Sequence, residues 1–136
     1  MTRRHQPFPA TPFEPLKEFP VFIAYVVVAS LLAVVLIGSG RAKLVRDEKI
    51  TDGMHKIGVP DSWFPRLSAL EIAAALGLIA GIFYRPLGIA AGIGIVAYFI
   101  GAVITHLRAK DTAGLPMPAV LIVVGAAALV LGVATV

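Results

Sequence analysis

Four long apolar runs, separated by short polar connections, dominate the pattern along the chain. They cover residues 21–40, 64–83, 87–106 and 117–136. Each run approaches the roughly 20 apolar residues that a helix needs to cross the hydrocarbon core of a bilayer. Because lipid forces the backbone to satisfy its hydrogen bonds internally, we predict an all-α membrane protein with four transmembrane helices in one antiparallel bundle. This four-helix bundle, residues 21–136, is expected to be a single domain.

The connection between the first two runs has a different pattern. In the stretch RAKLVRDEKITDGMHKIGVPDS, Ile50, Met54 and Ile57 recur at i, i+4 and i+7 with charged residues between them. One apolar face on a polar stretch is typical of a short amphipathic helix that lies in the membrane interface. Gly58 and Pro60 indicate where this interfacial segment ends.

The N-terminal arm, residues 1–20, contains five prolines and no periodic apolar face. Residues before proline disfavour the helical conformation. We therefore expect this arm to be extended or disordered, outside the membrane.

Only the three residues Tyr84 to Pro86 separate the second and third runs, so these two helices must be antiparallel neighbours. Gly77 and Gly81 on one side of this turn, and Gly88 and Gly92 on the other, form two GxxxG pairs. Such pairs let the backbones of two membrane helices approach closely. We interpret these glycines as packing residues.

The composition agrees with a membrane protein, since 58% of the residues are hydrophobic and only 15% are charged. The chain has no cysteine, which excludes a CxxC thiol-disulfide mechanism and any thiolate-ligated metal or iron–sulfur site. No structural metal and no intrinsic cofactor are expected, because one His and one Glu without softer ligands make a poor site. Any redox chemistry would need a bound molecule or a partner.

The basic residues are unevenly divided between the two sides of the predicted bundle. Four belong to one side: Arg3, Arg4, Lys17 and Arg85. Eight belong to the other: Arg41, Lys43, Arg46, Lys49, Lys56, Arg66, Arg108 and Lys110. The positive-inside rule then predicts a multi-pass protein of the cell membrane with the 41–63 and 107–116 loops in the cytoplasm and both termini outside. Because these residues flank spans and mix with acids, nucleic acid is not an expected partner.

Glu71 interrupts the apolar run LSALEIAAALGLIAG eight residues after the predicted start of its helix, roughly 12 Å deep. A carboxylate at such depth costs about 2.5 to 3.5 kcal/mol on a lone helix, so it normally faces the bundle interior. On the antiparallel third helix, Tyr98 lies eight residues before His106 and so reaches about the same depth. These side chains are expected to share one polar chamber that opens toward the cytoplasmic interface.

Two states of Glu71 remain open at this point. The carboxylate can pair with Arg41, Lys43 or His106, or burial can keep it protonated with Tyr98 or Ser68 as hydrogen-bond partner. A purely structural role, in which Glu71 only ties helices together, is the alternative to a functional one. The ligand-binding candidates are Glu71, His106, Tyr98, Lys43, Arg41, Ser68 and Thr105. Arg108 and Lys110 are interpreted as interface cations, and His5 and His55 as solvated side chains.

Several short motifs occur in a characteristic order: GSGRAKL at 38–44, KIGVP at 56–60, EIAAALGL at 71–78 and GAVITHL at 101–107. Together they resemble the DoxX-like family of small four-helix membrane proteins over about residues 21–136. The family name comes from a subunit of an archaeal thiosulfate:quinone oxidoreductase, and other relatives are associated with membrane redox complexes or membrane-protein assembly. The resemblance implies recurring polar positions at Lys43, Glu71 and His106.

Three functions are open. The first is an accessory or membrane-anchor subunit linked to membrane redox chemistry, whose chamber binds a quinone or another lipid-like molecule and whose partner is a membrane or soluble oxidoreductase. The second is a non-catalytic assembly or scaffold factor in which the polar cluster is structural. The third is a small proton-coupled transporter, although the first helix lacks the acid that small multidrug exporters carry there. The lipid bilayer is an expected partner in all three cases, and the glycine faces also suit a homo-oligomer.

Overall fold

A computed structural model describes residues 14–136 as an all-helical structure. Its α-helices are α1 (Glu14–Leu44), α2 (Glu48–Lys56), α3 (Phe64–Phe83), α4 (Arg85–Arg108) and α5 (Pro116–Ala134). Single 3-10 turns, Asp61–Trp63 and Thr112–Gly114, precede α3 and α5. Four of the five α-helices are long and apolar enough to cross a membrane. The predicted fold class is confirmed.

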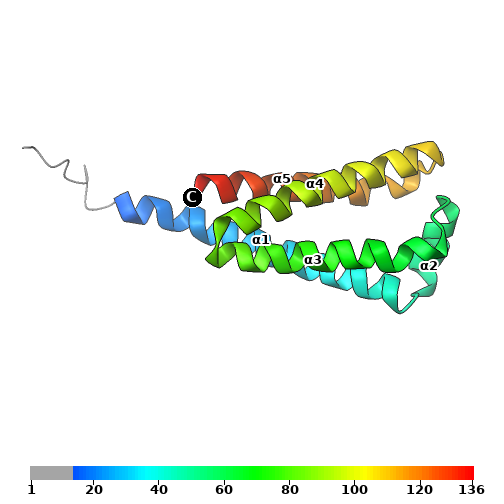
Figure 1. Ribbon diagram of the computed structural model, residues 1–136. Helices are drawn as coiled ribbons and strands as arrows, with labels where there is room; N and C mark the ends of the chain where they lie inside the picture. Colours follow the sequence, from blue (N-terminus) through cyan, green and yellow to red (C-terminus); the bar gives the residue numbers. More distant parts are fainter. Residues whose placement is uncertain (1–13) are drawn as a thin grey trace, which may run out of the picture.

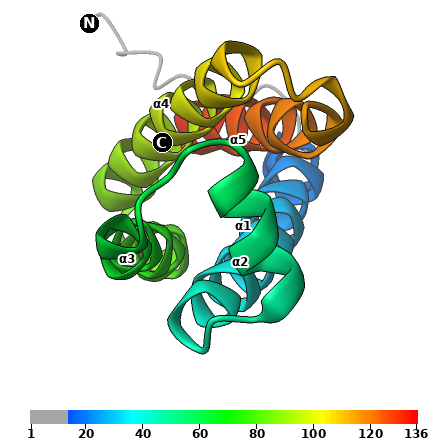
Figure 2. The ribbon, with the colours of Figure 1, turned by 90° about the vertical axis from the view of Figure 1, so that its right-hand side faces the viewer.

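The four long helices form a ring in which each one packs against two neighbours (Figures 1 and 2). α1 contacts α3 and α5, and α4 contacts the same two helices from the opposite side. Successive long helices run in opposite directions. The short helix α2 lies across one end of this ring, at the right of Figure 1 and in the foreground of Figure 2.

The beginning of α1 corrects one prediction. The arm over 1–20 is expected to be extended, yet α1 begins at Glu14, and residues 1–13 lie outside the described part of the chain. Proline is compatible with the first turn of a helix, where its missing N–H has no intrahelical partner, so Pro15 does not oppose this start. Pro20 lies inside the helix and removes only one backbone hydrogen bond.

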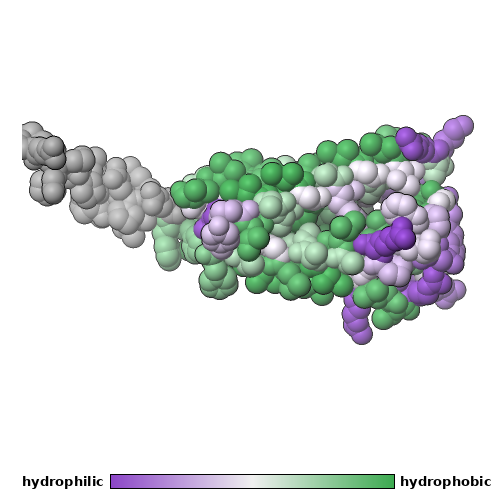
Figure 3. All heavy atoms as spheres, viewed as in Figure 1, coloured by the Kyte–Doolittle hydropathy of each residue, from purple (hydrophilic) through white to green (hydrophobic). Residues whose placement is uncertain are grey.

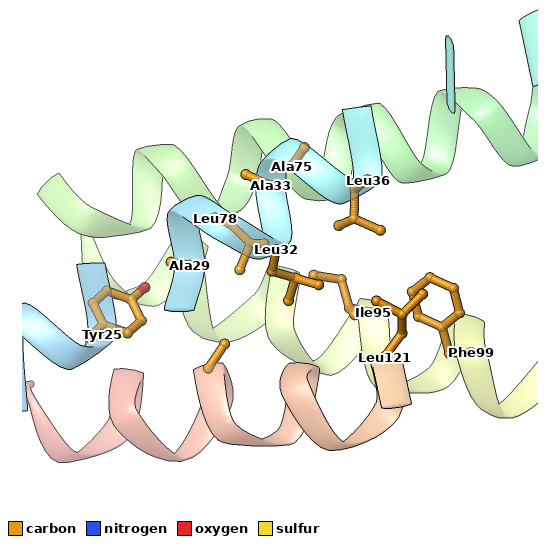
Figure 4. Packing of buried hydrophobic residues seen from close by; sticks show 11 residues of the cluster. Tyr25, Ala29, Leu32, Ala33, Leu36, Ala75, Leu78, Ile95, Phe99 and Leu121 are labelled. Carbon is orange, nitrogen blue, oxygen red and sulfur yellow. The ribbon is translucent and has the colours of Figure 1, made fainter. Parts of the chain in front are cut away.

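The interior of the bundle is a single apolar core (Figure 4). Its largest side chains include Tyr25, Leu32, Leu78 and Ile95, each at most 1% exposed. Many large apolar side chains of the same helices point outward instead, and Figure 3 shows them as an apolar belt, with hydrophilic residues gathered at the end that carries α2. Such an outer surface suits contact with lipid.

The helices α3 and α4 meet most closely at Gly81 and Gly88, next to the turn that joins them. A Cβ atom on Gly81 would overlap the backbone of Gly88, and a Cβ on Gly88 would overlap the hydroxyl of Tyr25. A Cβ on Gly77 would still lie only 2.9 Å from the Cβ of Ala91, and beyond this second contact the two helices diverge (Figure 1). Gly92 faces Leu129 of α5. The contact of Gly81 and Gly88 agrees with the packing role predicted from the sequence. It holds α3 and α4 together at the turn, and the pair forms a V that widens toward α2.

The contact between Gly81 and Gly88 leads to a first prediction. Gly81→Ala should lower the stability of the protein in detergent by about 1–3 kcal/mol, because the added methyl group separates two touching backbones. Gly94→Ala is the matched control, since a Cβ on Gly94 meets no atom within 4 Å. Thermal unfolding followed by circular dichroism measures both changes. Equal melting temperatures for the two variants would contradict the proposed contact.

Candidate functional site

A buried ion pair joins α1 and α3 inside the bundle. Lys43 Nζ lies 3.0 Å from both carboxylate oxygens of Glu71. The two residues are only 8% and 2% exposed, respectively. Ser39 donates its hydroxyl to Glu71 Oε1 at 3.1 Å and accepts a hydrogen bond from Lys43 Nζ at 2.9 Å. Of the three cations considered as partners of Glu71, the structure thus brings Lys43 to it.

Local sequence explains why these groups meet. Ser39 and Lys43 are four residues apart, so they lie on the same face of α1. One turn before Glu71, Ser68 donates its hydroxyl to the carbonyl oxygen of Gly40 at 2.7 Å. This bond needs a close approach of the helices, and a Cβ on Gly40 would lie only 3.0 Å from Ile72. Ser68 therefore acts as a clamp between α1 and α3 beside the ion pair.

A second polar cluster lies where α4 ends. His106 Nδ1 is 2.8 Å from Asp111 Oδ2, and Lys56 Nζ of α2 donates to Asp111 Oδ1 at 3.2 Å. The hydrogen bond with His106, and then the one from Lys56, hold the pKa of Asp111 below its ordinary value. His106 thus contacts Asp111 rather than Glu71.

The sequence interpretation missed Asp111 as a site residue. Beyond α4, Lys110 adopts a left-handed conformation with φ 55°, and the N–H groups of Lys110 and Asp111 bond to Leu107 and His106. This pattern is a Schellman motif, which reverses the chain directly after a helix. The reversal returns the Asp111 side chain to the His106 ring. An acid placed five residues after a histidine at a predicted helix end is the signal that could have found it.

The helix α2 is also attached on the side of α3. His55 Nε2 bonds to Asp61 Oδ1, and Arg46 pairs with the same carboxylate at 3.6 Å. The Arg46 guanidinium lies 5.2 Å from the ring centroid of Phe64, and the His55 ring is 5.8 Å from it. His55, interpreted from the sequence as simply solvated, is half-exposed and paired. His5 lies outside the described residues.

Between α2 and the bundle lies a cavity of about 720 Å³, called here the chamber. Its roof is formed by Ile50, Gly53 and Met54 of α2 and by Ile57, which follows the helix. Its polar lining includes Ser39, Lys43, Lys49, Glu71, Tyr98, Thr105, His106 and Asp111, and aromatic residues Trp63 and Phe99 also contribute. The chamber therefore brings both polar clusters to one mainly apolar space.

The remaining predicted residues take different places. Thr105 lines the chamber but donates its hydroxyl to the carbonyl of Gly101 in its own helix, at 2.8 Å. Arg41 is exposed and makes no ion pair with any residue of 19–136, the range whose side chains the structure describes. Arg108 and Lys110 are exposed at the end of α4, as interface cations would be. Among the described residues, no three His, Cys, Asp or Glu side chains gather as metal ligands.

The four apolar spans and the ion pair inside them define a small multi-pass membrane protein of the four-helix type. A model of the DoxX-like family matches residues 27–128, which includes Lys43, Glu71, Tyr98 and His106. The chain therefore belongs to the DoxX-like family. Comparison with curated proteins and with solved structures gave no match.

The buried pair leads to a second prediction. Lys43→Met should destabilise the protein by about 3 kcal/mol or more, because it leaves the Glu71 carboxylate buried without a counter-charge. Adding Glu71→Leu should restore most of this loss, since an apolar pair of similar volume needs no compensation. Arg41→Met is the control and should change stability by about 0.5 kcal/mol or less. Thermal unfolding in detergent compares the three variants with the wild type.

A third prediction concerns the attachment of α2. Asp111→Asn should release Lys56 and expose the underside of α2, so a thiol introduced by Met54→Cys should react with a maleimide several-fold faster than in the Met54→Cys protein alone. The chain has no other cysteine, and Asp52→Asn, an exposed change on α2, is the control. Unchanged labelling would show that the ion pair does not hold α2.

The lowered pKa of Asp111 also sets a pH dependence. A group with a depressed folded-state pKa contributes stability above its unfolded value, here 3.8, and loses it as the pH falls through the folded value. The wild type should therefore lose thermal stability in that acid range, and Asp111→Asn should lose less.

Proposed function

We propose that the chamber binds the polar head of a lipid-soluble molecule, with a quinone as the ligand. The observation that carries this proposal is the chamber itself. It has a volume of about 720 Å³, an amphipathic helix covers it, and the buried residues Glu71 and Lys43 line it. This volume lies within the range of roughly 300–1,000 Å³ that small-molecule sites occupy. Mostly apolar walls with a few convergent polar groups are the usual features of such sites.

The donor set of the chamber fits a quinone head. Quinone carbonyl oxygens accept hydrogen bonds, and Tyr98 and His106 offer an O–H and an N–H group to the same space. The rings of Trp63 and Phe99 supply flat apolar surfaces against which a planar head can stack. A bound quinone would supply two-electron redox chemistry, while these residues orient the head and exclude water.

We further propose that the protein serves as an accessory or membrane-anchor subunit of an oxidoreductase. The resemblance to DoxX-like proteins supports this role, because their name derives from a quinone-reducing complex. The α2 end is proposed to face the cytoplasm, since it carries eight of the twelve basic residues. A redox partner on that side would meet the roof of the chamber.

The fourth prediction tests quinone binding. Trp63 is the single tryptophan and lines the chamber, so its fluorescence should be quenched saturably by the tail-free probe 2,3-dimethoxy-5-methyl-1,4-benzoquinone. Tyr98→Phe should weaken binding about fivefold, equivalent to roughly 1 kcal/mol for one lost hydrogen bond. Tyr84→Phe is the matched control, because Tyr84 is exposed and lines neither the chamber nor its surroundings. Quenching that rises linearly without saturation in the wild type would contradict the proposal.

A scaffold role is the second candidate, and the Lys43–Glu71 pair is the observation that favours it. Both charges are satisfied within the protein, and they join two helices far apart in sequence. Under this alternative, Lys43→Met should lower thermal stability and the recovery of partner proteins together, and Trp63 should show no saturable quenching. Saturable quenching sensitive to Tyr98→Phe separates the two functions.

A further inference from the structure

A second cavity of about 560 Å³, called here the side groove, lies where α3 and α4 diverge. Small residues of both helices line it: Ala73, Ala74, Gly77, Ala91, Gly94 and Ala97. The divergence follows from the close contact of Gly81 and Gly88 at the other end of the same helix pair. The groove reaches inward as far as Leu36 of α1.

The side groove opens at the outside of the bundle and borders the chamber at its inner end. Its outer rim consists of exposed residues of α3 and α4, including Leu70 and Leu87, which are 58% and 49% exposed. Its inner end includes Glu71, Tyr98 and Phe99, and these three residues also line the chamber. The groove and the chamber therefore adjoin at these three residues, and the inner end of the groove lies at the buried carboxylate.

We propose that the side groove is a lateral passage through which the hydrocarbon tail of the chamber's ligand extends into the bilayer. This inference rests on the proposed function and assigns the ligand class: a polar head with a single prenyl or alkyl chain. The chamber is sized for a head group rather than a whole membrane lipid, so a tail needs an exit. The side groove supplies such an exit: its walls are mostly apolar, and its inner end lies at Glu71.

A passage for a hydrocarbon tail accounts for small residues such as Gly94 and Ala97 in the wall of the groove. A hydrocarbon tail gains little by leaving lipid for another apolar surface, because both environments are equally apolar. The wall of the passage therefore has to leave room for the tail, and it does not have to bind the tail more strongly than lipid does. Gly94 illustrates this, since a Cβ placed on it would meet no atom within 4 Å.

The fifth prediction uses Gly94→Leu to block the passage. Gly38→Leu is the matched control: Gly38 is an exposed helical glycine of α1, its Cβ would also meet no atom within 4 Å, and it lines neither cavity. Two probes with the same head, the tail-free benzoquinone above and its decyl-tailed form, are titrated against Trp63 fluorescence in nanodiscs. Affinities are expressed per mole fraction of lipid.

The expected result is selective. Gly94→Leu should weaken binding of the decyl-tailed probe at least tenfold and leave the tail-free probe unchanged, while Gly38→Leu should change neither. Equal affinities of wild type and Gly94→Leu for the decyl-tailed probe would overturn the passage and indicate that ordinary bilayer lipid fills the groove. Absence of saturable binding of the tail-free probe to the wild type would overturn the proposed function and the passage with it. If Gly94→Leu does not fold, Ala97→Leu on the exposed rim of the same groove replaces it.

Discussion

The ion pair between Lys43 and Glu71 is the constraint on which the rest of this structure depends. A carboxylate and an ammonium group are both removed from solvent, at 3.0 Å from each other, between helices that are otherwise apolar. Neither charge is tolerable there alone, so α1 and α3 must keep one register and one distance. The hydroxyl of Ser68 on the Gly40 carbonyl reinforces the same register one turn away.

The bundle is tight at one end and open at the other, and both ends follow from side-chain size and polarity. At the turn between α3 and α4, Gly81 and Gly88 allow the backbones to touch. Toward α2, the polar groups of Glu71 and Tyr98 and the larger ring of Phe99 line open space instead. A V-shaped helix pair of this kind produces a hollow in the wall without breaking either helix.

The roof of the chamber is held differently from its walls. The last turn of α2 and Arg46, just before the helix, make polar contacts with the bundle: His55 and Arg46 pair with Asp61, and Lys56 pairs with Asp111. The pairs with Asp61 are exposed. Exposed ion pairs contribute little individually, typically up to about 1 kcal/mol. The contacts of α2 with Asp61 are therefore weaker restraints than the fully buried pair of Lys43 and Glu71.

The sequence by itself determined the fold class, the four spans, the amphipathic segment and the depth of Glu71, because each depends on local composition and helical spacing. The family followed from short motifs in a fixed order. Only the tertiary structure decided which cation meets Glu71, because Arg41, Lys43 and His106 all lie near the same membrane side and differ only in the face of the helix they occupy. The helical start at Glu14, the position of Asp111 beside His106 and the side groove also depended on the three-dimensional structure. The contact of Asp111 with His106 depends on the chain reversal after α4. The side groove depends on the divergence of α3 and α4, which brings together residues that are distant along the chain.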